Sequence, residues 1–135
     1  MYHTCAIDEL NALWCWGYNQ HSEVGNGTTS TSSPPTLIGS NRAWRSVDAG
    51  GFHTCAVATD DTLSCWGYNP SGQSGQPSSV AITAPTAVTP DGWTAVSAGD
   101  YHSCGLRADG GGRPSWPRSL APQHHSPSAR RPQLW

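Results

Sequence analysis

The clearest structural signal lies in residues 44–69, which read WRSVDAGGFHTCAVATDDTLSCWGYN. Residues 53–75 repeat an earlier part of the chain, because residues 3–25 match them at eleven of twenty-three positions without a gap. A third copy begins at Trp93, 49 residues after Trp44, and again carries the Ala-Gly, His and Cys positions. Matches of this number at nearly one spacing indicate a tandem repeat of about fifty residues.

Each repeat predicts short strands separated by turn signals. Strands are favoured over residues 44–49, 52–57 and 62–66, and the acidic pair 60–61 between the last two predicts a hairpin turn. No window keeps an apolar period of 3.6 residues over three turns, so we expect no helix. Four short strands in a unit of about fifty residues are typical of a propeller blade, and they also fit a stacked β-solenoid.

The full repeated pattern is W-x-x-V-x-A-G-G-x-H-T-C-A, a short acidic turn, then L-x-C-W-G-x-N and a later Gly, and it extends over residues 2–109. It resembles the repeat of the regulator of chromosome condensation family. Members of that family fold as seven-bladed β-propellers. The resemblance therefore implies an all-β chain that forms a partial β-propeller of four-stranded antiparallel blades.

The chain departs from this pattern at both ends. Residues 1–2 stand at the position of residues 51–52, so the first copy lacks its Trp-x-x-Val strand, and the third copy has residues 114–116 (Pro-Ser-Trp) where Cys-Trp-Gly should stand. We expect residues 1–110 to form about two and a half repeats, and residues 111–135 to be a disordered or non-native C-terminal tail. Such a chain is expected to be a fragment of a longer propeller or, alternatively, to self-associate through open blade faces.

The five cysteines follow the repeat. Cys5 and Cys15, like Cys55 and Cys65, are ten residues apart around a turn, which predicts two disulfides across hairpins. Cys104 has a proline at the position of its partner, so we expect an unpaired thiol. The alternative is five reduced thiols packed as small apolar side chains. Disulfides would favour an extracellular or cell-surface parent protein, although no signal peptide precedes the first motif and the localisation stays open.

Histidine and tryptophan recur at fixed repeat positions, which favours structural roles. His3, His53 and His102 each begin a strand, and we expect each ring N–H to donate to a neighbouring carbonyl. A zinc site is disfavoured, because the sequence has no Cys-x-x-Cys or His-x-x-x-His spacing. Four tryptophans are expected to pack between blades instead of forming an exposed platform for sugars or bases: Trp16, Trp44, Trp66 and Trp93.

Charge and motif content exclude several functions. The chain has no lysine, which excludes a Walker-type phosphate loop and Schiff-base chemistry. It has no nucleophile elbow and no zinc-helix motif, so we expect no catalytic residue, no metal and no cofactor. Residues 1–109 hold nine acids and three arginines, which argues against a nucleic-acid partner. No apolar run reaches the roughly 18 residues that a membrane span needs, so no membrane partner is expected.

The sequence predicts a non-catalytic protein-binding scaffold. Residues 20–33 and 70–84 differ between copies while the strands around them match, and loops of this kind commonly carry function. We therefore expect a protein partner to contact these two loops. The family includes a nucleotide exchange factor for the small GTPase Ran, so the resemblance implies one alternative: a guanine-nucleotide exchange factor-like regulator acting through the full-length parent. A carbohydrate-binding module that uses tryptophan rings is another.

Overall fold

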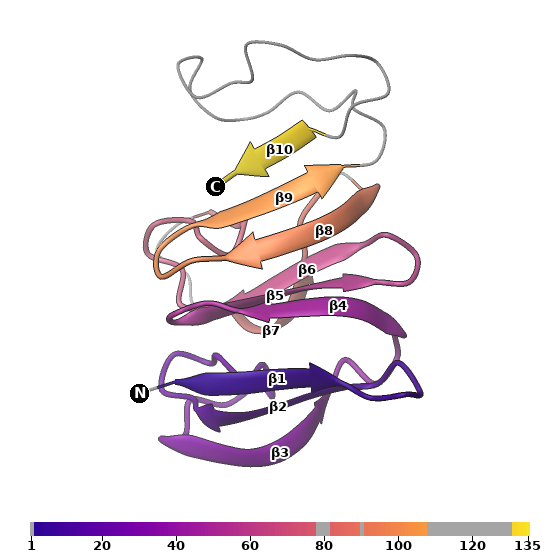
Figure 1. Ribbon diagram of the computed structural model, residues 1–135. Coiled ribbons are helices and arrows are strands. Elements are labelled where there is room, and N and C mark those ends of the chain that lie inside the picture. The colour runs from indigo at the N-terminus through magenta and orange to yellow at the C-terminus, as the bar shows by residue number, and fades with distance from the viewer. Residues whose placement is uncertain (1, 78–81, 90, 108–130) are drawn as a thin grey trace.

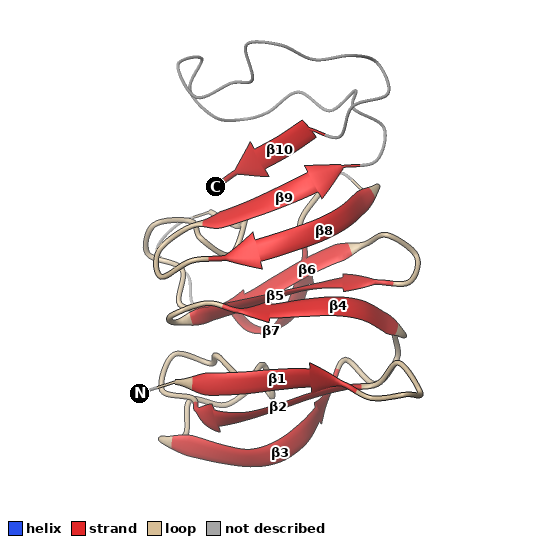
Figure 2. Ribbon diagram, viewed as in Figure 1, coloured by secondary structure: helices blue, strands red, loops and turns tan. Residues whose placement is uncertain are grey.

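The computed structural model describes residues 2–77, 82–89, 91–107 and 131–135. These residues form ten strands in three antiparallel sheets, which are stacked one on the other (Figure 1). Figure 2 shows strands and loops and no helix in the described part, so nothing there can serve as a membrane-spanning helix. The expected all-β fold is confirmed.

The middle sheet is a complete four-stranded blade. The first sheet contains β1 (His3–Ile7), β2 (Leu13–Tyr18) and β3 (Ser32–Ile38) in that order. The second contains β4 (Trp44–Ala49), β5 (His53–Ala58), β6 (Leu63–Gly67) and β7 (Ile82–Ala87). The third has the order β10-β9-β8, with β8 (Trp93–Ala98), β9 (Ser103–Arg107) and β10 (Arg131–Leu134). The first sheet thus lacks the strand equivalent to β4, as the sequence predicts.

The third sheet includes a segment of the expected tail. We expected residues 111–135 to be a disordered or non-native tail; of these, Arg131–Leu134 pair antiparallel with β9, where a four-residue segment finds backbone partners on the edge of a neighbouring strand. Residues 111–130 lie outside the described part of the chain.

The β1–β2 and β5–β6 hairpins have the same three-residue loop. The backbone N–H of Ala58 donates to the carbonyl of Thr62 at 2.9 Å, which closes the β5–β6 loop. Asp61 adopts a φ of 68°, and Asn11 adopts a φ of 61° at the equivalent place in the β1–β2 loop. Asp and Asn tolerate this left-handed conformation better than most residues. A three-residue loop places residues ten apart in the chain directly opposite each other.

This register brings the cysteines of each hairpin together. Cys5 lies opposite Cys15 and Cys55 opposite Cys65, with a Cα–Cα distance of 4.1 Å in both pairs. Both pairs are at disulfide distance, with Sγ–Sγ separations of 2.11 and 2.13 Å. Cys104 is a half-buried free thiol on β9, and burial raises its pKa.

Two apolar layers hold the three sheets together. The layer between the first and second sheets contains Leu13, Cys15, Val24, Ile38, Trp44, Ala56, Ala58 and Trp66. The layer between the second and third contains Cys55, Val57, Leu63, Cys65, Val88 and Trp93, with Val96 and Trp135 packed at its edge. Trp44, Trp66 and Trp93 are fully buried, so their expected role between blades is confirmed. Trp16 is only half-buried, on the outer face of the first sheet.

Candidate interaction surface

His3, at the start of β1, connects the first two sheets. Its Nε2 lies 2.6 Å from Oγ1 of Thr54, and that hydroxyl donates to the carbonyl of Glu23 at 2.7 Å. A hydroxyl has one proton to donate, so Nε2 of His3 must be the donor to Thr54. The ring is therefore in the neutral Nε2–H form. The pKa of His3 is lowered from 6.5 to about 4, mainly by burial and also by the nearby His53.

The same relay recurs between the second and third sheets. Nε2 of His53 lies 2.7 Å from Oγ of Ser103, which donates to the carbonyl of Gln73 at 2.7 Å. Burial is again the main cause that lowers the pKa of His53 to about 4. We expected each histidine ring to donate to a carbonyl. The ring instead pairs with a hydroxyl of the next sheet, and that hydroxyl donates to a carbonyl. His102, at the equivalent position in the third sheet, is exposed.

These histidines are occupied by contacts between sheets, and they do not gather with other ligand side chains. Within the described ranges, no three His, Cys, Asp or Glu side chains lie close enough together to hold a metal ion. The relays therefore join blades, and the candidate site lies elsewhere on the molecule.

Both variable loops leave the sheets at the same end of the stack, at the left in Figure 1. Of the predicted loop 20–33, residues 20–31 connect β2 to β3 and residues 32–33 already belong to β3. Of the predicted loop 70–84, residues 70–81 connect β6 to β7, with residues 78–81 outside the description, and residues 82–84 already belong to β7. In each loop an asparagine side chain accepts the backbone N–H five residues further on at 2.9 Å; the two residues are Asn19 and Asn69. The two loops thus begin with one shared framework that presents different side chains.

The two loops differ most in chemistry at their second residue. In the first loop the buried carboxylate of Glu23 accepts a hydrogen bond from the backbone N–H of His21 at 2.8 Å. The same carboxylate lies 3.2 Å from Nδ1 of the His21 ring. In the second loop Gln73 accepts the backbone N–H of Ser71 at 2.9 Å. The first loop therefore holds an imidazole ring at a position where the second has a small hydroxyl.

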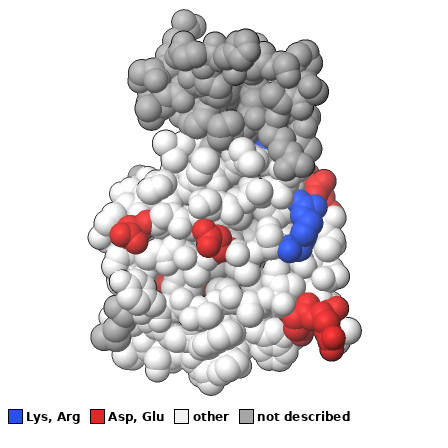
Figure 3. All heavy atoms as spheres, in the orientation of Figure 1, with Lys and Arg blue, Asp and Glu red and all other residues white. Residues whose placement is uncertain are grey.

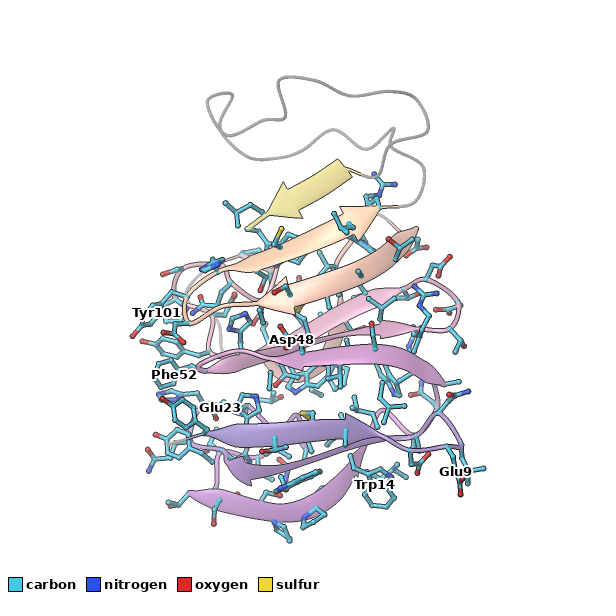
Figure 4. All side chains as sticks on the ribbon, in the orientation of Figure 1. Glu9, Trp14, Glu23, Asp48, Phe52 and Tyr101 are labelled. Carbon is cyan, nitrogen blue, oxygen red and sulfur yellow. A yellow bond between two sulfur atoms is a disulfide. The ribbon has the colours of Figure 1, made fainter. Side chains whose placement is uncertain are left out.

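Five ring side chains from the three sheets form a continuous row at this end, which we call the aromatic row: Tyr18, His21, Phe52, Tyr68 and Tyr101. The ring centroid of His21 lies 4.6 Å from that of Tyr68 and 5.8 Å from that of Phe52. Phe52 continues the row to Tyr101 at 5.9 Å, and both project from the left of the stack in Figure 4. Four of the rings line a pocket of about 120 Å³.

The aromatic row is the feature that sequence reasoning missed. Its signal was present, because an aromatic residue precedes each repeated histidine, at Tyr2, Phe52 and Tyr101. A tyrosine also follows each Trp-Gly pair, at Tyr18 and Tyr68. Tyr101 is 59% exposed and Tyr2 82%, while the other three are half-buried. Periodic aromatic residues that the core does not absorb are good candidates for contacts with a partner.

Paired charges lie at the opposite end of the stack, near the hairpin turns. Arg42 lies 3.2 Å from Asp60, and Arg45 pairs with Asp61. Figure 3 shows the main visible basic patch at the right of the view, and Figure 4 places Glu9 on the same side. The two ends therefore differ in chemistry: one presents aromatic rings and loops, and the other presents ion pairs.

The outer face of the first sheet is a second surface of interest. It exposes 36% of Trp14 and 43% of Leu37, and it leaves Trp16 half-buried. Trp66, the equivalent of Trp16 in the second sheet, is completely buried against the first sheet. The repeat thus presents the same residue type in a covered and in an uncovered setting.

Comparisons with known proteins agree with this architecture. Two sequence profiles, each described as a Regulator of chromosome condensation (RCC1) repeat, match residues 11–57 and residues 44–73 with 93–111. No curated protein matches the chain by sequence.

Solved propeller structures superpose on most of the chain. Human WBSCR16 has a TM-score of 0.71 at 19% identity, covering 82% of this chain and 29% of that one. Yeast RCC1 (Prp20) bound to Kap60 has a TM-score of 0.71 at 23% identity, covering 81% and 29%. Prp20p from Saccharomyces cerevisiae has a TM-score of 0.64 at 20% identity, covering 73% and 27%. The chain therefore spans less than a third of the length of these proteins. With the profile matches extending over more than half of its residues, the chain belongs to the regulator of chromosome condensation repeat family, and its three sheets are blades of a partial β-propeller.

Proposed function

We propose that this chain is a non-catalytic protein-binding scaffold whose partner docks on the aromatic row and the adjoining loops 20–33 and 70–84. The observation that carries this proposal is the continuity of the row across all three sheets. Tyrosine and phenylalanine are enriched at protein interfaces, and their rings bury a large area at a low cost in conformational entropy. Because the rings of the row contact one another, they lose less side-chain freedom when a partner binds than isolated rings would.

Charge and burial favour a protein over other partners. Among the described residues, the paired arginines Arg42 and Arg45 lie at the opposite end, so they give the aromatic row no positive charge that would attract a polyanion. Three tryptophans that could have stacked on sugars, Trp44, Trp66 and Trp93, are buried between blades. A carbohydrate-binding role therefore has little support among these residues.

The proposal is tested by affinity measurements on ligands selected from a displayed peptide library. Tyr68→Ala and Tyr101→Ala are expected to weaken the binding of selected peptides by tenfold or more, as truncation of an interface anchor does. Arg42→Ala, at the other end, is the matched control and should change the affinity by less than twofold. Equal affinities in all variants, or a loss confined to Arg42→Ala, would contradict the proposal.

A second candidate is a regulator of a small GTPase that acts through a longer protein. The likeness to Prp20p favours it, since binding properties of that protein to Gsp1p and histones are described. The test is binding of the folded chain to a panel of purified small GTPases with and without nucleotide. Binding that is stronger without nucleotide would support this candidate, and absence of binding to every member would remove it.

We further propose that the outer face of the first sheet pairs with a sheet of the same repeat type from a second copy. The equivalent face of the second sheet is covered by a sheet of this repeat type, namely the first sheet. Light scattering should then show a mass above that of one chain, which rises with concentration. Trp16→Ser should lower that mass, whereas a single-chain mass at every concentration would contradict the pairing.

A further inference from the structure

In the second sheet, Trp66 near the end of β6 completes the contact with the first sheet. Residues 63–66, Leu-Ser-Cys-Trp, pair with β5 so that Trp66 stands opposite Thr54. The third copy has no such sequence after Asp109-Gly110. Its central strand, β9, would therefore present an open edge unless another segment pairs with it.

Residues 132–135, Pro-Gln-Leu-Trp, occupy the equivalent positions on β9. Leu134 stands opposite Cys104, which is the place that Cys65 takes opposite Cys55. Trp135 then takes the place of Trp66. It exchanges two backbone hydrogen bonds with Ser103, at 2.6 and 2.8 Å. The match is thus one of register, residue for residue.

The indole of Trp135 also lies in an equivalent socket. The ring of Trp66 packs at 6.3 Å and 64° against Trp44, and the ring of Trp135 packs at 5.3 Å and 65° against Trp93. A glycine of the preceding sheet lies close to each indole. A Cβ on Gly25 would lie 2.5 Å from Nε1 of Trp66; one on Gly75 would lie 2.7 Å from Cγ2 of Val88 and 3.3 Å from Nε1 of Trp135.

The two tryptophans differ in one hydrogen bond. Nε1 of Trp66 donates to the carbonyl of Glu23 at 2.9 Å, whereas the buried Nε1 of Trp135 has no hydrogen-bond partner among the described residues. Residues 132–135 are therefore retained by backbone pairing and ring packing. Neither requires the cysteine that the repeat normally supplies at this strand.

We propose that the edge of β9, together with the socket formed by Gly75, Trp93 and Gly105, is a strand-binding site for an extended segment that carries a tryptophan. Residues 132–135 of this chain are its occupant. Recognition is by β-strand addition, in which backbone hydrogen bonds supply affinity and a side-chain pocket supplies specificity. This site is separate from the aromatic row and does not depend on the proposed partner.

Hydrogen exchange of single backbone amides tests the site in the full chain. The Ser103 N–H bonds only to Trp135 within the described residues, so it reports directly on the pairing. We expect this amide to exchange at least tenfold more slowly than an unstructured amide, and Trp135→Ala to abolish that protection. Trp16→Ala, at the equivalent position of the first sheet, is the matched control and should leave Ser103 protected. A free peptide with the sequence of residues 131–135 should restore protection to the Trp135→Ala chain.

Three results would overturn the proposal. One is exchange of the Ser103 amide at the unstructured rate in the unaltered chain. Another is unchanged protection in Trp135→Ala. The third is failure of the peptide to restore protection to a folded Trp135→Ala chain. If Trp135→Ala does not fold, the unaltered chain decides alone, since an NMR contact between the Trp135 indole and Gly75 must accompany the protected amide.

Discussion

Nε2 of His53 and Oγ of Ser103 lie 2.7 Å apart across the interface between the second and third sheets. The hydroxyl donates a hydrogen bond to the carbonyl of Gln73, so the three groups form one buried hydrogen-bonded chain of defined direction. The relay between His3 and Thr54 repeats it one blade earlier. A repeated hydrogen bond of this kind specifies how far one blade is translated and rotated against the next.

Removing the hydroxyl should be costly. Ser103→Ala leaves the buried Nε2–H of His53 and the carbonyl of Gln73 without their shared partner. Burying unsatisfied polar groups typically costs about 1–3 kcal/mol, so we expect the free energy of unfolding to fall by about 2 kcal/mol. Urea unfolding followed by tryptophan fluorescence measures this change. His102→Ala removes an exposed ring and should change the free energy of unfolding by no more than about 0.5 kcal/mol. If Ser103→Ala lost no more than this small amount either, the relay would contribute nothing to stability.

Stability should decrease in mild acid. The pKa of His53 falls to about 4 in the folded chain, with burial the first cause; His102 lowers it further and Asp48 partly opposes. An unfolded histidine titrates near 6.5, so between about pH 4 and 6.5 the unfolded state binds more protons. The stabilisation is therefore complete above about pH 6.5 and is lost progressively as the pH falls to about 4. A shift of this size corresponds to roughly 3 kcal/mol per histidine.

The measurement is urea unfolding of the unaltered chain and of His53→Gln at several pH values. Glutamine keeps a side-chain N–H donor but does not titrate in this range. The variant should therefore show a shallower pH dependence than the unaltered chain. A stability that is constant between pH 4 and 6.5 would mean that His53 is not buried in its neutral form.

Two glycines with the same backbone conformation separate packing from strain. Gly25 and Gly27 both have a φ of 83°. A Cβ on Gly25 would lie 2.5 Å from Nε1 of Trp66, whereas a Cβ on Gly27 would meet nothing within 4 Å. Gly27→Ala should then cost about 1 kcal/mol from backbone strain alone. Gly25→Ala should cost clearly more, about 3 kcal/mol or above, because Trp66 must also move. Thermal unfolding of the two variants gives the difference, and equal melting temperatures would place Trp66 elsewhere.

The two hairpin cystines should be present in protein folded under oxidising conditions. Intact mass should rise by about 2 Da for each bridge on reduction, giving two bridges and one thiol that was already free. Closing an eleven-residue ring is expected to stabilise the folded chain by about 3 kcal/mol per bridge. Cys104→Ala serves as the control, since this thiol is unpaired. A mass that does not change on reduction would show five free thiols.

Much of this fold follows from local sequence. The turn at Asp60-Asp61 and the ten-residue spacing of the cysteines determine the register of β5 and β6. With a three-residue loop, only one register is possible, and it places the two cysteines opposite each other. The sequence of the tail gave no comparable signal. Leu134 and Trp135 complete the third sheet only because β9 offers an edge and Gly75 offers space, and both are properties of the assembled stack.

The candidate site was only half predictable. Loops 20–33 and 70–84 were identified because they vary within a constant frame. The aromatic row was not, because its rings come from strand ends of three different sheets. They become neighbours only when stacking aligns those ends. His21 illustrates the difficulty, since its ring contacts Phe52 and Tyr68, which are distant in sequence.

The most direct test of the account is an NMR chemical-shift map of the chain bound to a peptide selected for affinity. The largest shifts should fall on the aromatic row, at Tyr68, Phe52 and Tyr101, and on the described parts of loops 20–33 and 70–84. Asp60 and Arg42, at the ion-paired end, should not move. A map centred on those two residues would contradict the claim that the aromatic end of the blades is the binding surface.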